Sequence, residues 1–272
     1  MKKTLEHRPA RKDEELSSIS SLANILQDIL KLEIEGDKAI KSGKYTEAMK
    51  IFTGALSFCP ESPHVVARFL CNRATALMAL HEICNAIADC NVAIALDGEY
   101  CHALSIRATI HESIKDYQEA ASDVRKLVCI LEMRSSGSLG SSCSEELRDA
   151  RKRMHRLEKE AKKGLTLDFY AILDVNQKAS ADDIKKSYHQ AALIFHPDKA
   201  WNLLKILRNR GYKQQWNKIS EDNKNGAEKI FKLLSQANSV LSDPVQRSEY
   251  DRKHNVKRAR SSSKTRSRSS QF

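Results

Sequence analysis

Glycine and proline are scarce in this 272-residue sequence, with nine and five residues respectively, and helix-forming residues dominate it. The sequence also lacks a long stretch in which apolar and polar side chains alternate, which is the pattern of a half-buried strand. The chain is long enough for two modest domains and a linker. We therefore expect an all-α protein with more than one domain.

Long apolar runs are missing as well. The opening residues are basic, but Asn24, Gln27 and Asp28 interrupt the apolar stretch at 22–30. No run approaches the roughly 20 apolar residues that a membrane-spanning helix needs, and the start does not have the pattern of a signal peptide. We expect a protein of the cytoplasm or the nucleus with no membrane partner.

The cysteines form no C-x-x-C pair, and no histidine accompanies them at a repeating metal-ligand spacing. There are seven of them, an odd and scattered set. Such a set is typical of small core residues in a reducing compartment, so we expect neither zinc nor any other cofactor. The sequence also lacks a glycine-rich phosphate loop and a nucleophile signature, so no catalytic activity of its own is expected.

The excess of positive over negative charge is confined to two stretches. Residues 199–220 and 257–272 each carry six basic residues and no acidic one, while the whole chain has a net charge of +11. The rest of the chain is therefore close to neutral. The basicity is a local property that belongs to these two segments.

Small residues recur at fixed spacing through residues 29–134, which we divide into three units. The second and third units begin 34 residues apart at Ala67 and Cys101, and the first begins at Ile29 with a four-residue insertion. This is the tetratricopeptide (TPR) pattern, in which small residues allow two helices of one unit to cross closely. The aligned small positions are Gly36, Ala74 and Ala108, then Ala48, Ala86 and Ala120.

Many three-repeat modules of the TPR family hold the acidic C-terminus of a heat-shock chaperone in a carboxylate clamp. At the clamp positions this chain matches the family only at Asn72, whereas Glu33 and Asp37 bring carboxylates. Like charges oppose binding, so we predict that the module does not hold a Glu-Glu-Val-Asp peptide and that its ligand or client is of another kind. The remaining clamp positions hold His102 and Ile106, and we assign Asn72, His102 and Arg107 to the groove of the repeats.

Two segments flank the repeats. Residues 1–28 form a polar leader with an amphipathic helix from Asp13, although a solvated leader is an alternative. Residues 135–166 form a Ser/Gly-rich loop and then a helix from Ser144 to about Lys163. That helix could cap the repeats or act as a semi-rigid spacer, but we favour a solvated linking helix.

A second module is predicted at residues 167–254. Ser180 is a good N-cap, with acidic residues in the first turn of the helix that follows. That helix leads into His196-Pro197-Asp198, and Pro197 ends it because proline disfavours helix at the residue before it. A second apolar face runs from Ile230 to Leu241 before Asp243-Pro244.

These elements resemble the J domain of the DnaJ family. The opening Asp168-x-Tyr170-x-x-Leu173-x-Val175 and the closing Arg247-x-x-Tyr250-Asp251 are similar to the family's first and last motifs. His-Pro-Asp alone is weak evidence, but all the elements in order are strong evidence. The domain order is similar to that of plant proteins of the DnaJ subfamily C type, which join TPR repeats to a C-terminal J domain.

The resemblance implies a co-chaperone. In the family, the aspartate of the triplet, here Asp198, engages an arginine of a heat-shock protein 70 chaperone in its ATP state and stimulates ATP hydrolysis. A positive stripe on the preceding helix normally steers the chaperone, but here it is thinned to two lysines, so weaker or more selective docking is expected. Phe231 matches a family aromatic residue that contacts the chaperone, and it could equally be a core residue. The implied chaperone-binding residues are Lys185, Lys186, Tyr188, His189, His196, Pro197, Asp198 and Phe231.

Two basic segments leave a second function open. Residues 200–225 form a long insertion after the triplet, in which Trp201, Leu204 and Leu207 favour a prolonged second helix of the J domain that packs on the domain. Basic residues among aromatic ones are also typical of a site that binds single-stranded RNA.

The tail 255–272 is rich in Arg and Ser and is expected to be disordered. The alternative function is a nuclear or RNA-associated scaffold with a secondary J-domain role.

Overall fold

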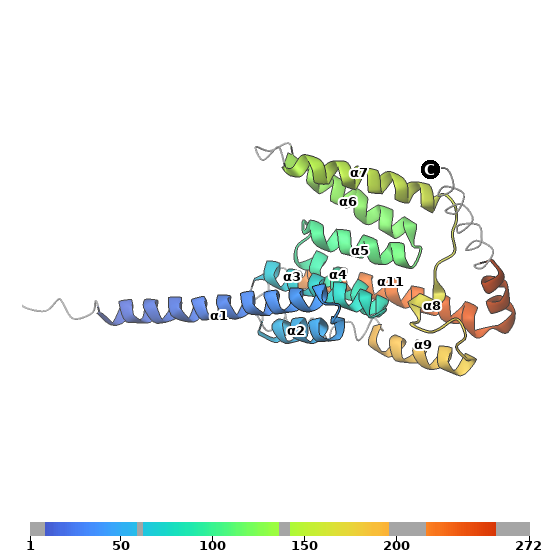
Figure 1. Cartoon of the computed structure of the whole chain (residues 1–272), viewed down its shortest axis with the longest axis horizontal. Coiled ribbons are helices and arrows are strands. Elements are labelled where there is room, and N and C mark those ends of the chain that lie inside the picture. Colours follow the sequence, from blue (N-terminus) through green and yellow to red (C-terminus); the bar gives the residue numbers. More distant parts are fainter. Residues whose placement is uncertain (1–8, 59–61, 136–141, 196–215, 254–272) are drawn as a thin grey trace, which may run out of the picture.

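The computed structural model describes residues 9–58, 62–135, 142–195 and 216–253. Every regular element in these ranges is an α-helix, as Figure 1 shows, and the all-α prediction is confirmed. In chain order the helices are α1 (Pro9–Lys41), α2 (Tyr45–Phe58), α3 (Pro63–Ala79), α4 (Ile83–Leu96), α5 (Cys101–Ser113), α6 (Tyr117–Ser135), α7 (Ser142–Ala161), α8 (Phe169–Ile172), α9 (Ala181–Phe195) and α11 (Trp216–Ser242).

Helices α1 to α6 form three successive helical hairpins. Helix α1 pairs with α2, α3 with α4 and α5 with α6, and neighbouring hairpins contact each other. At the first crossing, Gly36 lies so close to Phe52 that an added Cβ atom would stand 2.3 Å from the Cζ atom of the ring. This is the close helix approach for which a repeat needs small residues, so the TPR-like fold is confirmed. The other small positions are buried: Ala48, Ala74, Ala86, Ala108 and Ala120.

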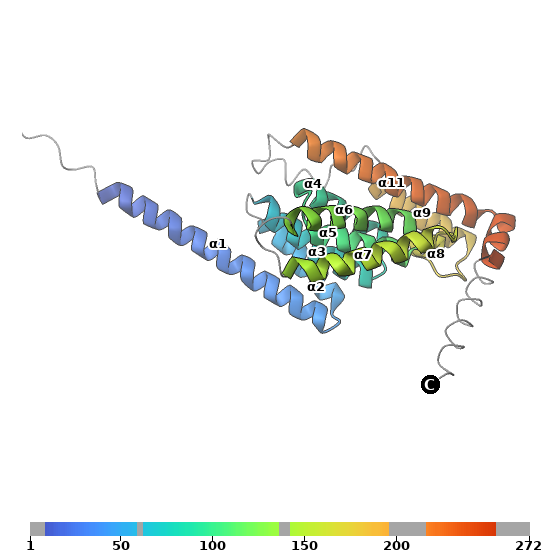
Figure 2. The same ribbon diagram turned by 90° about the horizontal axis from the view of Figure 1, so that it is seen from above.

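Helix α1 is longer than a repeat helix. The predicted amphipathic helix and the first helix of the repeats are one continuous element of 33 residues. Residues 19–28 are all exposed, and Ile29 is the first buried residue that the structure describes. Figures 1 and 2 both show the N-terminal half of α1 extending away from the other helices.

A buried ion pair recurs in the second and third hairpins. Arg73 on α3 donates from Nε and Nη2 to the two carboxylate oxygens of Asp89 on α4, each at 2.7 Å. Arg107 on α5 makes the same two bonds to Asp123 on α6 at 2.9 and 2.6 Å. A two-pronged contact of this kind fixes geometry as well as adding strength. Each pair therefore ties together the two helices of its own hairpin.

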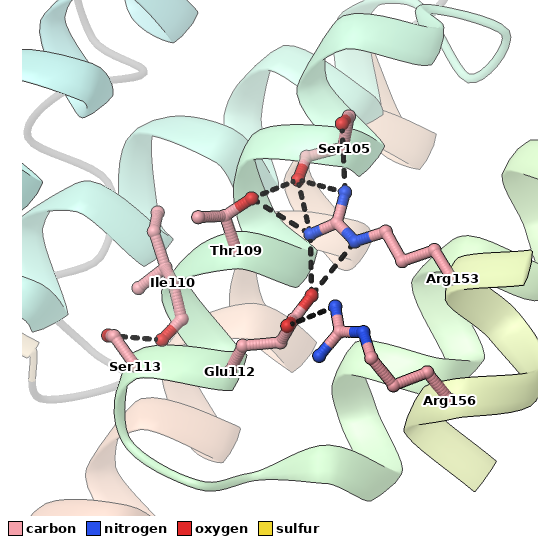
Figure 3. A network of polar contacts seen from close by, with 7 residues as sticks. All are labelled: Ser105, Thr109, Ile110, Glu112, Ser113, Arg153 and Arg156. Carbon is pink, nitrogen blue, oxygen red and sulfur yellow. Dashed lines mark hydrogen bonds and ion pairs between the residues drawn. The ribbon is translucent and has the colours of Figure 1, made fainter. Parts of the chain in front are cut away.

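Helix α7 packs along α6 at the end of the repeats. Arg153 and Arg156 on α7 both donate to the carboxylate of Glu112 on α5, at 2.8 and 2.7 Å, and Arg153 also donates to the hydroxyls of Ser105 and Thr109 (Figure 3). The apolar side of α7 joins the core of the third repeat. Helix α7 therefore packs as a cap on the repeats, whereas the sequence favoured a solvated linking helix. The buried residues on that side are Leu147, Ala150 and Leu157.

The last part of the described chain is a helical hairpin of α9 and α11 with the short α8 beside it. Helix α11 has 27 residues, and it begins inside the predicted insertion. The described part of the insertion, 216–225, therefore prolongs the helix after the triplet, whereas the sequence predicted a longer helix before it. Trp201, Leu204 and Leu207, on which that prediction rested, lie outside the described residues.

The hairpin packs directly on the repeats. Helix α11 contacts α4 as well as α9, and α8 contacts α4. One cluster of buried residues includes Ile83, Ile87 and Ile114 from the repeats together with Phe169 and Ile230 from the hairpin module. The two modules thus share a core. Of the described helices, none combines the length and the apolar character needed to cross a bilayer.

Candidate functional site

The candidate site is built on α9, and reciprocal hydrogen bonds determine where this helix begins. Ser180 Oγ accepts from the backbone N–H of Asp183 at 3.1 Å, while the Asp183 carboxylate accepts from the N–H and the hydroxyl of Ser180 at 3.1 and 2.7 Å. This is a capping box, and it agrees with Ser180 as the predicted N-cap. The hydrogen bonds from Ser180 lower the pKa of Asp183. With the start of the helix fixed, the direction of every later side chain follows.

The inner face of α9 packs against α11. Ile184 and Phe195 are buried there, and Tyr188 and Ala191 are partly buried in the same core. The hydroxyl of Ser187 donates to the carbonyl of Leu173, which joins α9 to the end of α8. Phe195 is the last residue of α9 that the structure describes. The helix is therefore anchored in the core at the residue that precedes His196.

The outer face of α9 carries most of the predicted chaperone-binding residues of this helix. Lys185, Lys186 and His189 are exposed, as is Gln190. Tyr188 lies between the two faces, with its ring centroid 5.7 Å from that of His189. The structure thus brings the predicted residues of α9 onto one accessible side of the hairpin.

The same outer face ends in two exposed apolar residues. Leu193 is 62% exposed and Ile194 is 58% exposed. The sequence prediction considered this helix for its basic residues and overlooked Leu193. The sequence does predict this exposure. The apolar residues of the inner face define its direction on the helix, and at 3.6 residues per turn residue 193 lies on the opposite side. The outer face is therefore cationic near its start and apolar near the triplet.

The triplet and Phe231 complete the predicted set. His196, Pro197 and Asp198 lie outside the described residues. Phe231 is on α11, next to the buried Ile230, and its side chain is half-buried. It lies at the edge of the core, so the structure decides for neither of its two predicted roles.

The opening and closing motifs of this module contact each other. The Tyr250 hydroxyl accepts from the backbone N–H of Phe169 at 3.1 Å, and the Tyr170 hydroxyl donates to Asp251 at 2.9 Å. Arg247 Nε donates to the Tyr170 hydroxyl at 2.9 Å. Burial raises the pKa of the Tyr250 hydroxyl, which therefore stays protonated. These contacts join the start of the module, at α8, to its last residues. They explain why aromatic and charged residues occur in both the opening and the closing motif.

A second predicted site lies on the repeats. We define the groove face as the side of α1, α3 and α5 that carries Glu33, Asp37, Asn72 and His102. Asn72 Nδ2 donates to Asp37 Oδ1 at 3.5 Å, and Arg68 pairs with Glu33 at 3.0 Å. Burial lowers the pKa of His102, and the opposing effect of Asp37 is smaller, so the imidazole is neutral near pH 7. Where a carboxylate clamp needs free cations, the groove face holds Asp37 and a neutral histidine, and its Arg68 is already paired with Glu33.

Arg107 does not belong to the groove face, and the prediction for it is wrong. Its guanidinium bonds to Asp123 and, at 2.6 Å from Nη1, to Asn91 Oδ1 on α4. It lines a cavity of about 370 Å³ between the repeats and α11. The physical reason is helical phase. Five residues after His102, a side chain points about 140° away around the helix.

Comparisons with known proteins agree with this architecture. The family model described as DnaJ domain matches residues 168–251. A DnaJ homolog subfamily C member 7 homolog of Schizosaccharomyces pombe is 29% identical over 240 residues, which cover 88% of this chain and 43% of that protein. The human DnaJ homolog subfamily C member 7 is 31% identical over 217 residues, which cover 80% of this chain and 38% of that protein.

Among solved structures, the repeats are similar to the TPR2B domain of yeast Sti1, described as a pHsp70 complex. The identity is 25% and the TM-score 0.41, and the match covers 49% of this chain and 98% of that one. The chain spans only about two fifths of the length of the two curated relatives. Residues 168–251 are a DnaJ domain behind TPR-like repeats, and the chain is a DnaJ-domain protein consistent with the TPR-containing members of DnaJ subfamily C.

Proposed function

We propose that the chain is a co-chaperone that stimulates the ATPase of a heat-shock protein 70 chaperone through His196-Pro197-Asp198. The observation that carries this proposal is the DnaJ domain at residues 168–251. Its helix α9 presents an exposed outer face and ends at Phe195, the residue before the triplet in the sequence. The chain itself performs no covalent chemistry in this proposal, and it acts in the cytoplasm or the nucleus.

The mechanism is a shift in the conformational equilibrium of the partner. The carboxylate of Asp198 pairs with an arginine of the chaperone in its ATP state, and a charge-assisted pair of this kind is directional. The outer face of α9 binds at the same time, with Lys185 and Lys186 steering the approach. If both contacts favour the conformation that hydrolyses ATP, docking raises the population of that conformation and hence the rate.

Leu193 and Ile194 add an apolar contribution to this docking. They lie on the last turn of α9, close in sequence to the triplet, and they are the large apolar residues of α9 that remain exposed. Contacts between exposed charges weaken as salt is added, whereas apolar burial does not. We therefore expect docking that depends less on salt than docking through a full basic stripe.

The repeats act as a protein–protein interaction module in the same proposal. Their groove face does not favour an acidic C-terminal peptide, because Asp37 would repel it and Arg68 is already paired with Glu33. The alternative of an RNA-associated scaffold has no support in the described part of the insertion. Residues 216–225 are part of α11, where Ile219 is buried in the core of the repeats.

The test is the substitution Asp198→Asn, with Asp182→Asn as the matched control. Asp182 is an exposed aspartate at the opposite end of α9. In a single-turnover ATPase assay with a heat-shock protein 70 chaperone, we expect the wild type and the control to stimulate hydrolysis and Asp198→Asn to give the basal rate. Circular dichroism should show the same helical content in all three proteins. Full stimulation by Asp198→Asn would contradict the mechanism.

A further inference from the structure

We propose that the repeats position the J domain, through an interface that holds α11 and α8 on the second and third repeats and turns the outer face of α9 outward. The part that concerns chaperone stimulation rests on the proposed function, whereas the interface itself does not. The residues of this interface are positioning residues. They act through α9 and do not touch the chaperone.

The N-terminal half of α11 supplies the apolar part of the interface. Ile219 is buried within the core of the first and second repeats, and Ile230 is buried in the core that both modules share. Asn223 and Ala227 are buried between them in sequence. These positions follow the spacing of one helix face, which continues into the residues that pack against α9. Residues 216–225 of the insertion therefore extend α11 far enough to reach the repeats.

Gly226 marks a close approach of the two modules. An added Cβ atom would stand 2.5 Å from Nδ2 of Asn91 on α4 and 3.0 Å from its Cγ. Asn91 cannot easily move aside, because its Oδ1 accepts a hydrogen bond of 2.6 Å from Arg107. Glycine in a helix interior is less favourable than alanine, because it loses more conformational freedom on folding. The glycine is therefore unfavourable for α11 alone and is suited to the docked helix.

Polar contacts join the modules at three further places. The backbone N–H of Asp168 donates to the carbonyl of Ile114 at 2.9 Å. Lys229 on α11 pairs with Glu119 on α6 at 3.1 Å. The thiol of Cys84 on α4 donates to the carbonyl of Ile172 on α8, with sulfur and oxygen 3.5 Å apart. The contacts are spread along α8 and α11, so together they fix orientation as well as position.

This interface leaves both candidate binding surfaces accessible. The main contacts of α9 are with α11, and its outer-face residues are exposed. On the groove face, His102 is also exposed. The interface uses α4 and the α5–α6 end of the repeats instead. A ligand on the groove face and a chaperone on α9 can therefore be bound at the same time.

Cys84 provides a natural reporter of the docked state. It is buried where α4 meets α8, and burial raises the pKa of its thiol to about 12. Because the thiolate is the reactive form, the docked cysteine resists alkylation. Cys71 and Cys90 are fully buried and serve as internal controls for the folding of the repeats. Loss of docking should increase the reactivity of Cys84 while these two stay protected.

The experiment compares Gly226→Leu with Asn225→Leu, its exposed neighbour on the same helix. Native full-length proteins are treated with iodoacetamide, and each cysteine is followed by peptide mass spectrometry. We expect Cys84 to react about tenfold faster in Gly226→Leu than in the wild type, because overpacking a tight interface shifts the docking equilibrium by about that factor. Asn225→Leu should leave the rate unchanged. Chaperone ATPase stimulation should fall in Gly226→Leu only, since α9 is no longer held in place.

Three results would overturn the proposal. The interface does not exist if Cys84 in the wild type reacts as fast as the exposed Cys129. The interface has no positioning role if Gly226→Leu frees Cys84 and still stimulates fully. If Cys71 and Cys90 react as well, the variant has unfolded, and the smaller substitution Gly226→Ala then decides. Its Cβ atom meets the same contact with Asn91, so it should increase Cys84 reactivity while Cys71 and Cys90 stay protected, and no increase would refute the interface. A wild type that stimulates no chaperone refutes the proposed function alone.

Discussion

Arg73 and Asp89 are enclosed within the second repeat, with 12% and 5% of their side chains exposed. When one partner of such a pair is removed, the other charge stays buried without compensation. A surface pair behaves differently, because water and salt screen both of its charges. Arg151 and Glu132 form such a pair between α7 and α6, with about half of each side chain exposed.

These two ion pairs give a matched prediction for stability. We expect Arg73→Ala to lower the free energy of unfolding by about 3–5 kcal/mol, because it leaves Asp89 unpaired in the core. Arg151→Ala should lower it by less than about 1 kcal/mol. Urea denaturation followed by circular dichroism measures both values. Equal losses would show that the enclosed pair is not the source of the stability.

The sequence contained a signal for these pairs that the prediction did not use. Arg73 and Arg107 are 34 residues apart, and so are Asp89 and Asp123, which is the period of the repeat. The periodic alignment used small residues and large apolar or aromatic ones, so it did not include the charged partners. Arg107 was instead assigned to the groove face together with His102. Its phase on the helix excludes that placement, and this phase can be counted from the sequence.

At the scale of elements, α1 combines a packed half and an exposed half. Ile29 is 5% exposed and contacts the core of the first repeat, whereas Leu26, less than one turn earlier, is 57% exposed. The two residues have similar size and lie in the same helix. Comparing an alanine substitution at each of them therefore separates the contribution of packing to stability from that of helix propensity.

The prediction for α1 follows from this contrast. Ile29→Ala should lower the free energy of unfolding by about 2–5 kcal/mol, because it removes apolar burial and leaves a cavity. Leu26→Ala should change it by less than about 0.5 kcal/mol, the usual range for a surface substitution. Thermal denaturation of both variants provides the comparison. A large loss for Leu26→Ala would mean that the outer half of α1 is packed in solution.

Helix α11 has a packing partner that its local sequence does not predict. The apolar face from Ile230 to Leu241 was predicted and is buried against α9. The same face continues backwards to Ile219, inside the insertion, where basic and aromatic residues interrupt the apolar pattern. Even a correct helix boundary would not have indicated α4 as the partner. The contact of Gly226 with Asn91 depends on tertiary structure and has no periodic signature.

At the scale of the whole molecule, the repeats and the J domain share one buried cluster. The sequence was sufficient for the fold class, for the repeats and for the family of the second module, because each of these has motifs at fixed spacing. It predicted two modules and a linker helix, and so it could not place one module on the other. The shared core is formed by residues that look like ordinary core in either module, such as Ile87 and Ile230.

A shared core predicts cooperative unfolding. We expect a single thermal transition for the full chain, with equal calorimetric and van't Hoff enthalpies, because neither module can unfold without exposing part of the other's core. Differential scanning calorimetry measures both quantities. Two resolved transitions, or a van't Hoff enthalpy well below the calorimetric one, would show that the modules are independent.

The exposed half of α1 has a consequence for how the molecule moves in solution. A helix of 33 residues is about 50 Å long at a rise of 1.5 Å per residue. Part of that length extends beyond the other helices (Figure 2). A rod attached to a globule adds hydrodynamic drag but little mass. The protein should therefore elute early in gel filtration for its 30.7 kDa, and its X-ray scattering should show a long tail of interatomic distances.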